Sequence, residues 1–582
     1  MSLGFASLIS GVGGFASPDV CMALGCASLT SRVRGLLLAL LVFVALPVVA
    51  RAAGDSGGFV MTVGRDTIGL ERFTRTAAGA EGTLLFIPSS LRFDYALEIA
   101  ADGRVQRMEN AVRPASAAPG AAPTQSAMLE WRADSVIADV TPGGLQRLAS
   151  RPGSMPYLNP SMFMLELIVK RAGASSPPSG SIPVFAVSGG RTIDATLRFV
   201  TRDSLELVLG GAAMQLRLDA HGRILSGAVP AQGVRFERVE SLPPALLAMA
   251  PVDYSAPAGA PYTAESVRVP TRGGFELGGT LTRPVPAAGK AAPALLPCVI
   301  TITGSGPQDR DERLPIVSGY RLFRQVADTL SRRGIAVLRL DDRGTGESGG
   351  RFAGSTSADF GDDVQDALAW LRRRSEIDPT RLALLGHSEG GLIAPMVALH
   401  EPTLAALVLL AGPAWNGRRV LEYQNERAIR KQLSGAAFDS AMAVAKKGID
   451  SLATSDPWFG WFIRYDPLPA ARRIAKPHVL LLQGETDRQV SAEQVDELAA
   501  AFKAAGNRDV TVKKLTATNH LFLPDPSGDP TGYSQLPSGE VPRETLGLIA
   551  DWLAARLLPA HGTHTIKLGV PTPAPASRPP RP

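Results

Sequence analysis

The chain has little cysteine, no metal-binding spacing and no concentrated basic charge, and each shortage excludes a class of protein. Cys21 and Cys26 precede an apolar segment near the start, so Cys298 is the one cysteine of the body and an internal disulfide framework is excluded. No CxxC or histidine-rich spacing predicts a metal, and no cofactor is expected. A net charge of +6 over 582 residues, with no basic stripe interleaved with aromatic residues, does not support nucleic-acid binding.

The composition is that of a globular protein with a buried core, because 45% of the residues are hydrophobic and 20% are charged. The length exceeds that of one ordinary domain and predicts two folded domains with tails. The Pro/Ala-rich end, residues 565–582, predicts a disordered tail.

Residues 1–52 have the pattern of a secretory signal peptide with a long N-terminal region. The cationic residues 31–34 precede the apolar run 35–50, and Ala50-Arg51-Ala52 supplies a cleavage site. The run is too short to span a membrane comfortably. We therefore expect cleavage at this point, no stable membrane span afterwards, and a periplasmic or secreted protein. An uncleaved anchor and a later start at Met22 are the alternatives.

Residues 57–240 consist of short runs that alternate apolar and polar residues, such as 195–200 and 205–209, separated by turn residues such as 219–222. This pattern predicts half-buried antiparallel strands, and helical periodicity is scarce. The region contains no recognisable catalytic set. We expect a β-rich accessory domain that binds substrate, a partner or a component of the cell envelope. Residues 241–263, rich in proline and alanine, predict a linker.

Residues 264–560 alternate predicted strands with predicted helices, which indicates an α/β domain with a largely parallel sheet. Residues 266–271 and 275–282 predict an opening antiparallel pair. Further strands are predicted over residues 298–303, 335–340, 382–385, 404–410, 478–482 and 510–515. Helices are predicted over residues 320–333, 358–374, 391–400 and 543–557. The insertion at about 413–477 predicts a helical cap, with helices over 418–433 and 438–452 before the aromatic run 458–462.

The sequence Gly386-His387-Ser388-Glu389-Gly390-Gly391 follows an apolar strand and opens a helix, which is the layout of a nucleophile elbow. Small residues two before and two after the serine let backbone segments pass closely. The turn would expose Ser388 Oγ and aim the backbone N–H of Glu389 at a developing oxyanion. The alternative is an ordinary strand-to-helix turn, so the assignment depends on the rest of the chain.

A nucleophilic serine needs a base and an orienting acid, which follow it in the order acid, then histidine, in this kind of fold. Asp487 and His520 each lie on a loop after a predicted strand, at the edge where open α/β sheets place their sites. They are the preferred acid and base. His387 competes as base, but it lies inside the elbow and cannot easily fold back onto Ser388. Competing acids are Asp456, Asp466 and Glu485.

A second oxyanion donor is expected from Gly304-Ser305-Gly306-Pro307, the loop after the strand over 298–303. Its glycines allow close backbone approach. The N–H of Ser305 is the preferred donor, with that of Gly306 as the alternative.

Three segments together resemble the α/β-hydrolase superfamily: residues 304–312, 342–348 and 386–391. More narrowly, they resemble bacterial serine carboxylesterases of the dienelactone-hydrolase and prolyl-oligopeptidase-like branch, and residues 458–467 and 484–490 fit that subgroup too. The resemblance covers roughly residues 263–558 and implies Ser388 as nucleophile, Asp487 as acid and His520 as base. Thr303 departs from the histidine that many relatives have before the oxyanion loop.

These observations predict an exported serine hydrolase that cleaves carboxylic esters of small to medium acyl groups through an acyl-enzyme. A serine peptidase or amidase is the first alternative, because the branch includes both activities. A catalytically inert protein that binds an envelope ligand is the second. Asp342 and Arg343 are expected to be structural, holding the loop after their strand.

Overall fold

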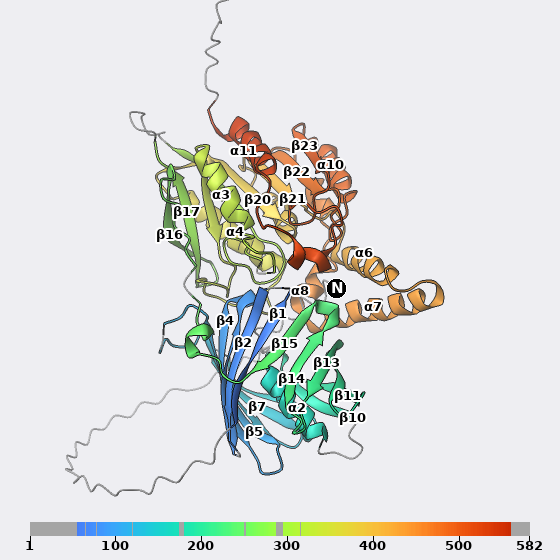
Figure 1. Cartoon of the computed structure of the whole chain (residues 1–582). Coiled ribbons are helices and arrows are strands. Elements are labelled where there is room, and N and C mark those ends of the chain that lie inside the picture. Colours follow the sequence, from blue (N-terminus) through green and yellow to red (C-terminus); the bar gives the residue numbers. More distant parts are fainter. Residues whose placement is uncertain are drawn as a thin grey trace, which may run out of the picture.

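The computed structural model describes residues 55–559, except residues 65, 77, 119, 142, 174–179, 250–251, 287–294 and 315. The expected signal peptide and tail therefore lie outside the described residues. Two sheets organise the described chain, and they lie one above the other in Figure 1. Within these residues, no helix combines the length and the apolar character that crossing a membrane requires.

The N-terminal half is one sheet of fifteen strands in the order β8-β7-β6-β5-β4-β3-β2-β1-β15-β14-β13-β12-β11-β10-β9. Neighbouring strands are antiparallel, except that β9 and β10 run parallel. The expected β-rich antiparallel half is therefore confirmed. Its strands are β1 (Asp55–Val63), β2 (Asp66–Arg75), β3 (Gly79–Phe86), β4 (Leu91–Ile99), β5 (Val105–Pro114), β6 (Gln125–Trp131), β7 (Ser135–Thr141), β8 (Gly144–Ala149), β9 (Met155–Tyr157), β10 (Gly180–Ala186), β11 (Arg191–Phe199), β12 (Ser204–Leu209), β13 (Ala212–Leu218), β14 (Ile224–Val229) and β15 (Val234–Val239).

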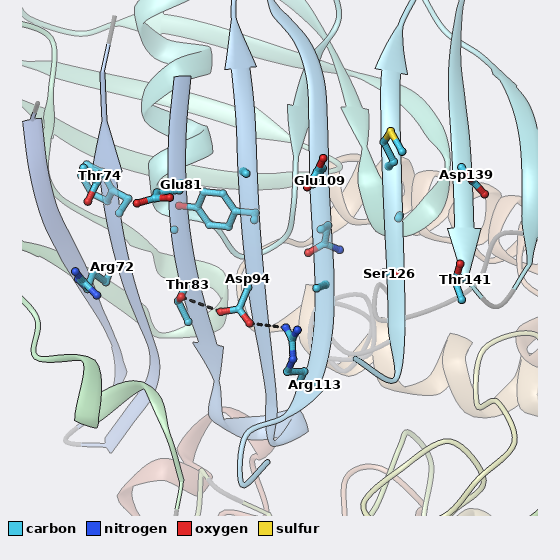
Figure 2. Close-up of a pocket in the computed structure, with 18 residues that line it drawn as sticks. Arg72, Thr74, Glu81, Thr83, Asp94, Glu109, Arg113, Ser126, Asp139 and Thr141 are labelled. Carbon is cyan, nitrogen blue, oxygen red and sulfur yellow. Dashed lines mark hydrogen bonds and ion pairs between the residues drawn. The ribbon is translucent and has the colours of Figure 1, made fainter. Parts of the chain in front are cut away.

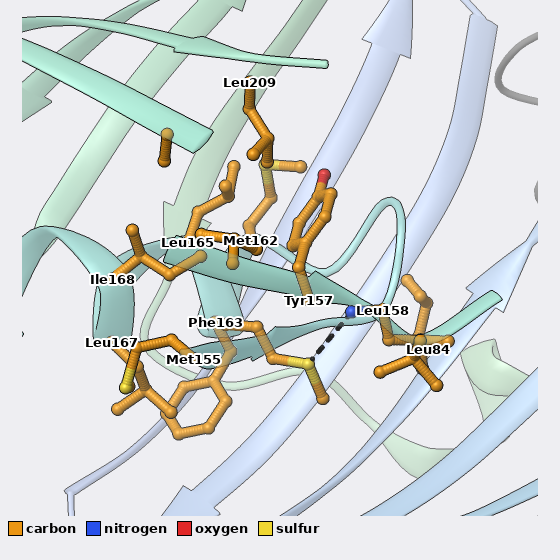
Figure 3. Packing of buried hydrophobic residues seen from close by; sticks show 14 of the residues in the cluster. Leu84, Met155, Tyr157, Leu158, Met162, Phe163, Leu165, Leu167, Ile168 and Leu209 are labelled. Atoms are coloured by element: carbon orange, nitrogen blue, oxygen red, sulfur yellow. Dashed lines mark hydrogen bonds between the residues drawn. The ribbon is translucent and has the colours of Figure 1, made fainter. Parts of the chain in front are cut away.

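The sheet packs around a buried helix that the alternation of the sequence did not predict, α2 (Met162–Gly173). Met162 and Phe163 of α2 belong to the same buried apolar cluster as residues of the surrounding strands such as Leu84, and Figure 3 shows part of this cluster. Nine of the twelve residues of α2 are buried. Its sequence therefore lacks the alternation of apolar and polar faces by which an amphipathic helix is recognised.

Glu71 of β2 fixes the start of α2. Its buried carboxylate accepts hydrogen bonds from the backbone N–H groups of Met162 and Phe163, at 2.7 and 3.0 Å, and from the Ser161 hydroxyl at 2.5 Å. These bonds satisfy donors that a helix N-terminus otherwise leaves unpaired, and a negative charge there is favoured by the helix dipole. Burial nevertheless raises the pKa of Glu71.

The opposite face of strands β2 to β7 bears a polar groove of about 690 Å³ (Figure 2). A hydrogen-bonded chain crosses it, in which Thr83 and Arg113 both donate to Asp94, at 2.9 and 2.7 Å. All the residues that line the groove belong to the N-terminal half.

The region expected to be a linker packs against the N-terminal sheet. Leu242 and Leu247, the latter in the short 3₁₀ helix η4 (Pro244–Leu247), are buried against Leu85. A second connection between the halves is the bond from Arg313 to the Ser90 hydroxyl, at 2.6 Å. Leu242 and Leu247 thus anchor the first part of this region to the N-terminal sheet.

The C-terminal half is an eight-stranded sheet in the order β16-β17-β19-β18-β20-β21-β22-β23. The β16–β17 and β17–β19 pairs are antiparallel and the remaining five pairs are parallel, which confirms the predicted α/β arrangement. The strands are β16 (Tyr262–Pro270), β17 (Glu276–Pro284), β18 (Leu296–Ile302), β19 (Ala336–Leu340), β20 (Ile377–His387), β21 (Ala406–Leu410), β22 (His478–Gly484) and β23 (Val510–Leu515).

Helices cover both faces of this sheet, so its central strands are apolar on both sides. One face packs on α3 (Leu322–Arg332) and α11 (Arg543–Leu557). The other packs on α4 (Ser357–Leu371), α5 (Glu389–Ala398) and α10 (Gln494–Ala504). The insertion between β21 and β22 forms α6 (Gly417–Arg430), α7 (Gly435–Ser455), α8 (Pro457–Phe462) and α9 (Leu468–Ala471). In Figure 1, α6 and α7 project to one side of the sheet, near the N-terminal half.

Candidate active site

Ser388 lies at the turn between β20 and α5, at the centre of the parallel sheet. Its φ of +52° is a strained conformation for a residue with a side chain. The neighbouring glycines are required sterically. A Cβ on Gly386 would lie 2.0 Å from the carbonyl oxygen of Gly390, and one on Gly390 would lie 2.0 Å from that of Ile302. The segment therefore has the backbone geometry of a nucleophile elbow.

Asp487 and His520 are in direct contact, since His520 Nδ1 lies 2.7 Å from Asp487 Oδ2. Gln483 donates to the same carboxylate oxygen at 3.0 Å. The other oxygen accepts the backbone N–H groups of Gln489 and Val490, at 2.8 and 2.9 Å. Four donors thus hold a carboxylate whose side chain is fully buried. Because a carboxylate only accepts, His520 Nδ1 bears a proton and Nε2 is available as a base.

The loop that bears His520 is shaped by the buried side chain of Asn519. Its Oδ1 accepts the N–H groups of Leu521 and Leu523, at 2.9 and 3.1 Å, and its Nδ2 donates to Asp525 at 3.3 Å. Phe522 has a φ of +59°, another strained backbone position. The histidine is thus presented by a tight turn that one amide side chain fixes.

The loop bearing His520 also contacts the elbow, because His387 Nε2 lies 2.9 Å from the His520 carbonyl oxygen. Within the described residues, the Ser388 hydroxyl is not hydrogen-bonded to the His520 ring. Catalytic hydrogen bonds of this kind are often long in the absence of substrate and tighten in its complex.

The loop after β18 lies against the elbow, since a Cβ on Gly304 would be 3.4 Å from Ser388 Cβ. The N–H of Gly304 itself donates to Glu312 at 2.8 Å and is not available to an oxyanion. In the described part of the chain, the N–H groups of Ser305 and Glu389 have no acceptor. Both remain able to serve as oxyanion donors.

Asp342 holds this loop. It accepts the hydroxyl of Thr303 at 2.7 Å and the N–H of Gln308 at 2.9 Å. Burial raises its pKa well above the usual range. Arg343 extends to Asp363 of α4, with bonds of 2.7 and 2.9 Å. These contacts are structural ones.

The Glu389 side chain points away from the oxyanion position and joins the elbow to other elements. Its Oε1 accepts the Ser357 hydroxyl at 2.5 Å and the indole N–H of Trp458 at 2.7 Å. Burial raises the pKa of this carboxyl. A cavity of about 40 Å³ lies beside Glu389 and is also lined by Thr301 and Asp342. Such a volume accommodates a water molecule.

The competing candidates have other roles. Asp456 caps α8 by accepting the N–H of Phe459 at 3.1 Å, and Asp466 accepts that of Leu468 at 3.0 Å. Glu485 is exposed. Among the described residues, no three or more histidine, cysteine, aspartate and glutamate side chains gather to hold a metal ion.

Sequence reasoning missed the roles of Glu312 and Trp458. Glu312 hydrogen-bonds both to Gly304 and to His387, the latter at 2.7 Å. The sequence gives a signal for Glu312 only through its place in the segment 304–312, which carried the resemblance. Trp458 was expected in the cap, but its contact with Glu389 joins residues 69 positions apart.

Comparison with known proteins shows that residues 316–475 are similar to the family described as serine aminopeptidase, S33. Esterase EstD of Thermotoga maritima is 25% identical over 264 residues, which are 44% of this chain and 62% of that protein. A Bacillus subtilis protein named uncharacterized peptidase YuxL is 25% identical over 264 residues, 44% of this chain and 35% of its own. The chain thus spans less than two thirds of the length of these relatives.

Among solved structures, the Pyrococcus furiosus esterase Pf2001 aligns with 53% of this chain and 96% of its own, at 19% identity and a TM-score of 0.36. The topology of the eight-stranded sheet, the elbow on its central strand and the sequence matches agree with one another. The C-terminal half of this chain belongs to the α/β-hydrolase superfamily.

Proposed function

We propose that the protein is an exported serine hydrolase that cleaves carboxylic esters of small to medium acyl groups through an acyl-enzyme. The observation that carries the proposal is the contact between Asp487 and His520, whose side chains lie 2.7 Å apart. The loop that bears His520 also contacts the elbow that bears Ser388. Similarity to a protein named esterase supports the ester as substrate class. The residues before the described chain support export by their signal-peptide pattern.

In the proposed first step, the Ser388 oxygen attacks the ester carbonyl while its proton passes to His520 Nε2. Asp487 holds the ring in the required tautomer and stabilises the imidazolium. The N–H groups of Glu389 and Ser305 bind the oxyanion. His520 then returns the proton to the leaving alkoxide as the C–O bond breaks, which leaves an acyl group on Ser388. Water repeats the sequence, releases the acid and restores the hydroxyl.

The cap contributes a stack of aromatic rings next to the elbow. Trp458 and Phe462 are stacked with ring centroids 5.0 Å apart, and Trp458 contacts Glu389. This arrangement supports an apolar wall that limits acyl length and excludes water during acylation.

Replacement of the nucleophile tests the proposal. Ser388→Ala should lower kcat/KM for p-nitrophenyl acetate and butyrate by at least about a thousandfold with an unchanged melting temperature. The exposed Ser440 of α7 offers a matched control, and Ser440→Ala should retain full activity. Full activity of Ser388→Ala would contradict the proposal.

A peptidase or amidase is the second candidate, favoured by the match to the serine aminopeptidase family over residues 316–475. A panel of short esters and of aminoacyl and prolyl amides separates the two. We expect kcat/KM for the esters to exceed that for the amides, and the reverse order would favour the second candidate.

We also propose that the N-terminal half contributes to recognition of the natural substrate or of an envelope component. The polar groove on β2 to β7 supports this role, because charged and hydroxyl side chains line it. Thr83→Lys and Ser126→Lys would obstruct the groove. They should leave p-nitrophenyl acetate hydrolysis unchanged but reduce binding to isolated envelope material, and equal binding would contradict this role.

A further inference from the structure

A second buried histidine–carboxylate pair lies beside the one that contains His520. His387 Nδ1 is 2.7 Å from Glu312 Oε1, and the side chains of both residues are about 95% buried. The His387 ring lies 5.0 Å from the His520 ring, centroid to centroid. The proposed mechanism does not use either Glu312 or His387.

The partners of His387 define where its protons are. Nε2 faces the carbonyl oxygen of His520 at 2.9 Å, and a carbonyl oxygen only accepts. Nδ1 faces Glu312 Oε1, which already accepts the N–H of Gly304 at 2.8 Å. Both ring nitrogens therefore point at acceptors. An imidazolium beside a carboxylate satisfies both contacts, whereas a neutral ring would leave one of them without a proton.

Glu312 and His387 together connect three segments of the site: the oxyanion loop, the elbow and the loop that bears His520. Glu312 binds the first residue of the oxyanion loop through the Gly304 N–H, and its own φ of +52° is a strained position that its surroundings must hold. His387 immediately precedes Ser388 in the elbow. Its second nitrogen binds the backbone of His520 itself. A displacement at any of these contacts would change the geometry among Ser388, His520 and the Ser305 N–H.

We propose that Glu312 and His387 form a buried carboxylate–imidazolium pair that positions the oxyanion loop, the nucleophile and the loop of the catalytic histidine relative to one another. They are positioning residues, because they act through the Gly304 N–H and the His520 carbonyl. The inference rests on the proposed function in that it takes Ser388 and His520 as the reacting groups.

The surrounding charges agree with a protonated ring. Burial alone lowers the pKa of His387, but the charge and hydrogen bond of Glu312, the His520 carbonyl and the more distant charge of Asp487 outweigh it and raise the pKa. The His387 ring also lies against the His520 ring and the uncharged ring of Phe522. A raised pKa means that the pair stabilises the fold fully below about pH 6.5. This stabilisation is lost as the pH rises through the folded value.

Nitrogen NMR of the full chain labelled with ¹⁵N-histidine tests the charge state without any measurement of activity. The His387 signals are assigned by their loss in His387→Gln. We expect both ring nitrogens to be protonated at pH values well above the ordinary histidine pKa of about 6.5. A ring with one unprotonated nitrogen at about pH 7 would overturn the proposal, whether or not the protein hydrolyses esters.

Kinetics of Glu312→Gln test the positioning role, because glutamine keeps the size but removes the charge. We expect kcat for p-nitrophenyl butyrate to fall by about a hundredfold, with KM changed less than about threefold. The reason is that misplaced reacting groups slow the chemical step more than they weaken substrate binding. The difference in the free energy of unfolding between the wild-type protein and Glu312→Gln should become smaller as the pH rises. An unchanged kcat would overturn the proposal.

The control is His478→Gln. His478 also pairs with a carboxylate, Asp509, at 2.6 Å, but it lies at the start of β22, the opposite end of the strand from Asp487. Its loss should leave kcat unchanged. If Glu312→Gln does not fold, the NMR measurement on the wild-type protein decides. If Ser388→Ala retains activity, the proposed function fails while the charge state of His387 remains separately measurable.

Discussion

Trp458 of the cap donates its indole N–H to the carboxyl group of Glu389 at 2.7 Å, which joins the insertion to the residue that follows Ser388. The cap is therefore attached at the elbow itself. Trp458 also stacks on Phe462 and meets the edge of Phe459, so one side chain supports both the hydrogen bond and the aromatic cluster.

Trp458→Phe separates these two roles, because phenylalanine retains a stacking ring and loses the N–H. We expect the free energy of unfolding to fall by about 1–3 kcal/mol, since a buried acceptor loses one of its donors. Denaturant titration measures this change. Trp461→Phe is the matched control, because Trp461 stacks on Tyr465 with centroids 4.5 Å apart and has no contact with Glu389. An equal effect of both variants would contradict the account.

Asp487→Asn should lower kcat/KM for short esters by about 10³- to 10⁴-fold while the protein remains folded. The amide can present its NH₂ to His520 and so favour the wrong tautomer of the ring. The measurement is steady-state kinetics at neutral pH. Asp466→Asn, at the competing acid that accepts only the N–H of Leu468, should remain within about twofold of wild type. Substantial activity in Asp487→Asn would remove Asp487 from the mechanism.

Glu389→Gln should change the pH dependence of stability. Burial raises the pKa of Glu389, so the folded state prefers the protonated carboxyl. The corresponding stability is fully present below the unfolded value of about 4.5 and is lost as the pH rises through the folded value. Glutamine cannot ionise, and its oxygen can still accept from Ser357 and Trp458. The melting temperature of Glu389→Gln should therefore rise relative to that of the wild-type protein as the pH increases from acid to alkaline. Melting temperatures that differ by the same amount at every pH would refute this interpretation.

Gly390→Ala should prevent correct folding of the elbow, because the added Cβ would lie 2.0 Å from the carbonyl oxygen of Ile302, a backbone atom that cannot rotate away. We expect a loss of about 3 kcal/mol or more in the free energy of unfolding. Gly547→Ala is the matched control. Apart from the adjacent residues and the backbone of α11 itself, no atom lies within 4 Å of its added Cβ, so that variant should gain about 0.5–1 kcal/mol. A stable, active Gly390→Ala would contradict the close backbone approach.

Local patterns were sufficient for the elements with strong periodicity. The strand over residues 510–515 and the helix over residues 543–557 have the bounds that the sequence predicted. The contact between Asp487 and His520 was also anticipated, because both lie on loops at the same edge of a parallel sheet. The hydrolase fold follows from such regularities.

Other features depend on contacts that no local pattern contains. α2 is buried on nearly every side, so its helical period is invisible in a sequence read as alternating strands. Glu312 and His387 lie 75 residues apart, and only the folded chain shows that the histidine rejected as a base has a carboxylate partner. The region expected to be a linker is rich in proline and alanine, yet Leu242 and Leu247 anchor it to the sheet.

The most direct test of the central claim is covalent labelling of the full chain with a fluorophosphonate, followed by mass mapping of the modified peptide. The account predicts one stoichiometric adduct on Ser388, which forms much more slowly in His520→Gln and not at all in Ser388→Ala. Absence of labelling, or an adduct on a different residue, would contradict the assignment of Ser388 as an activated nucleophile.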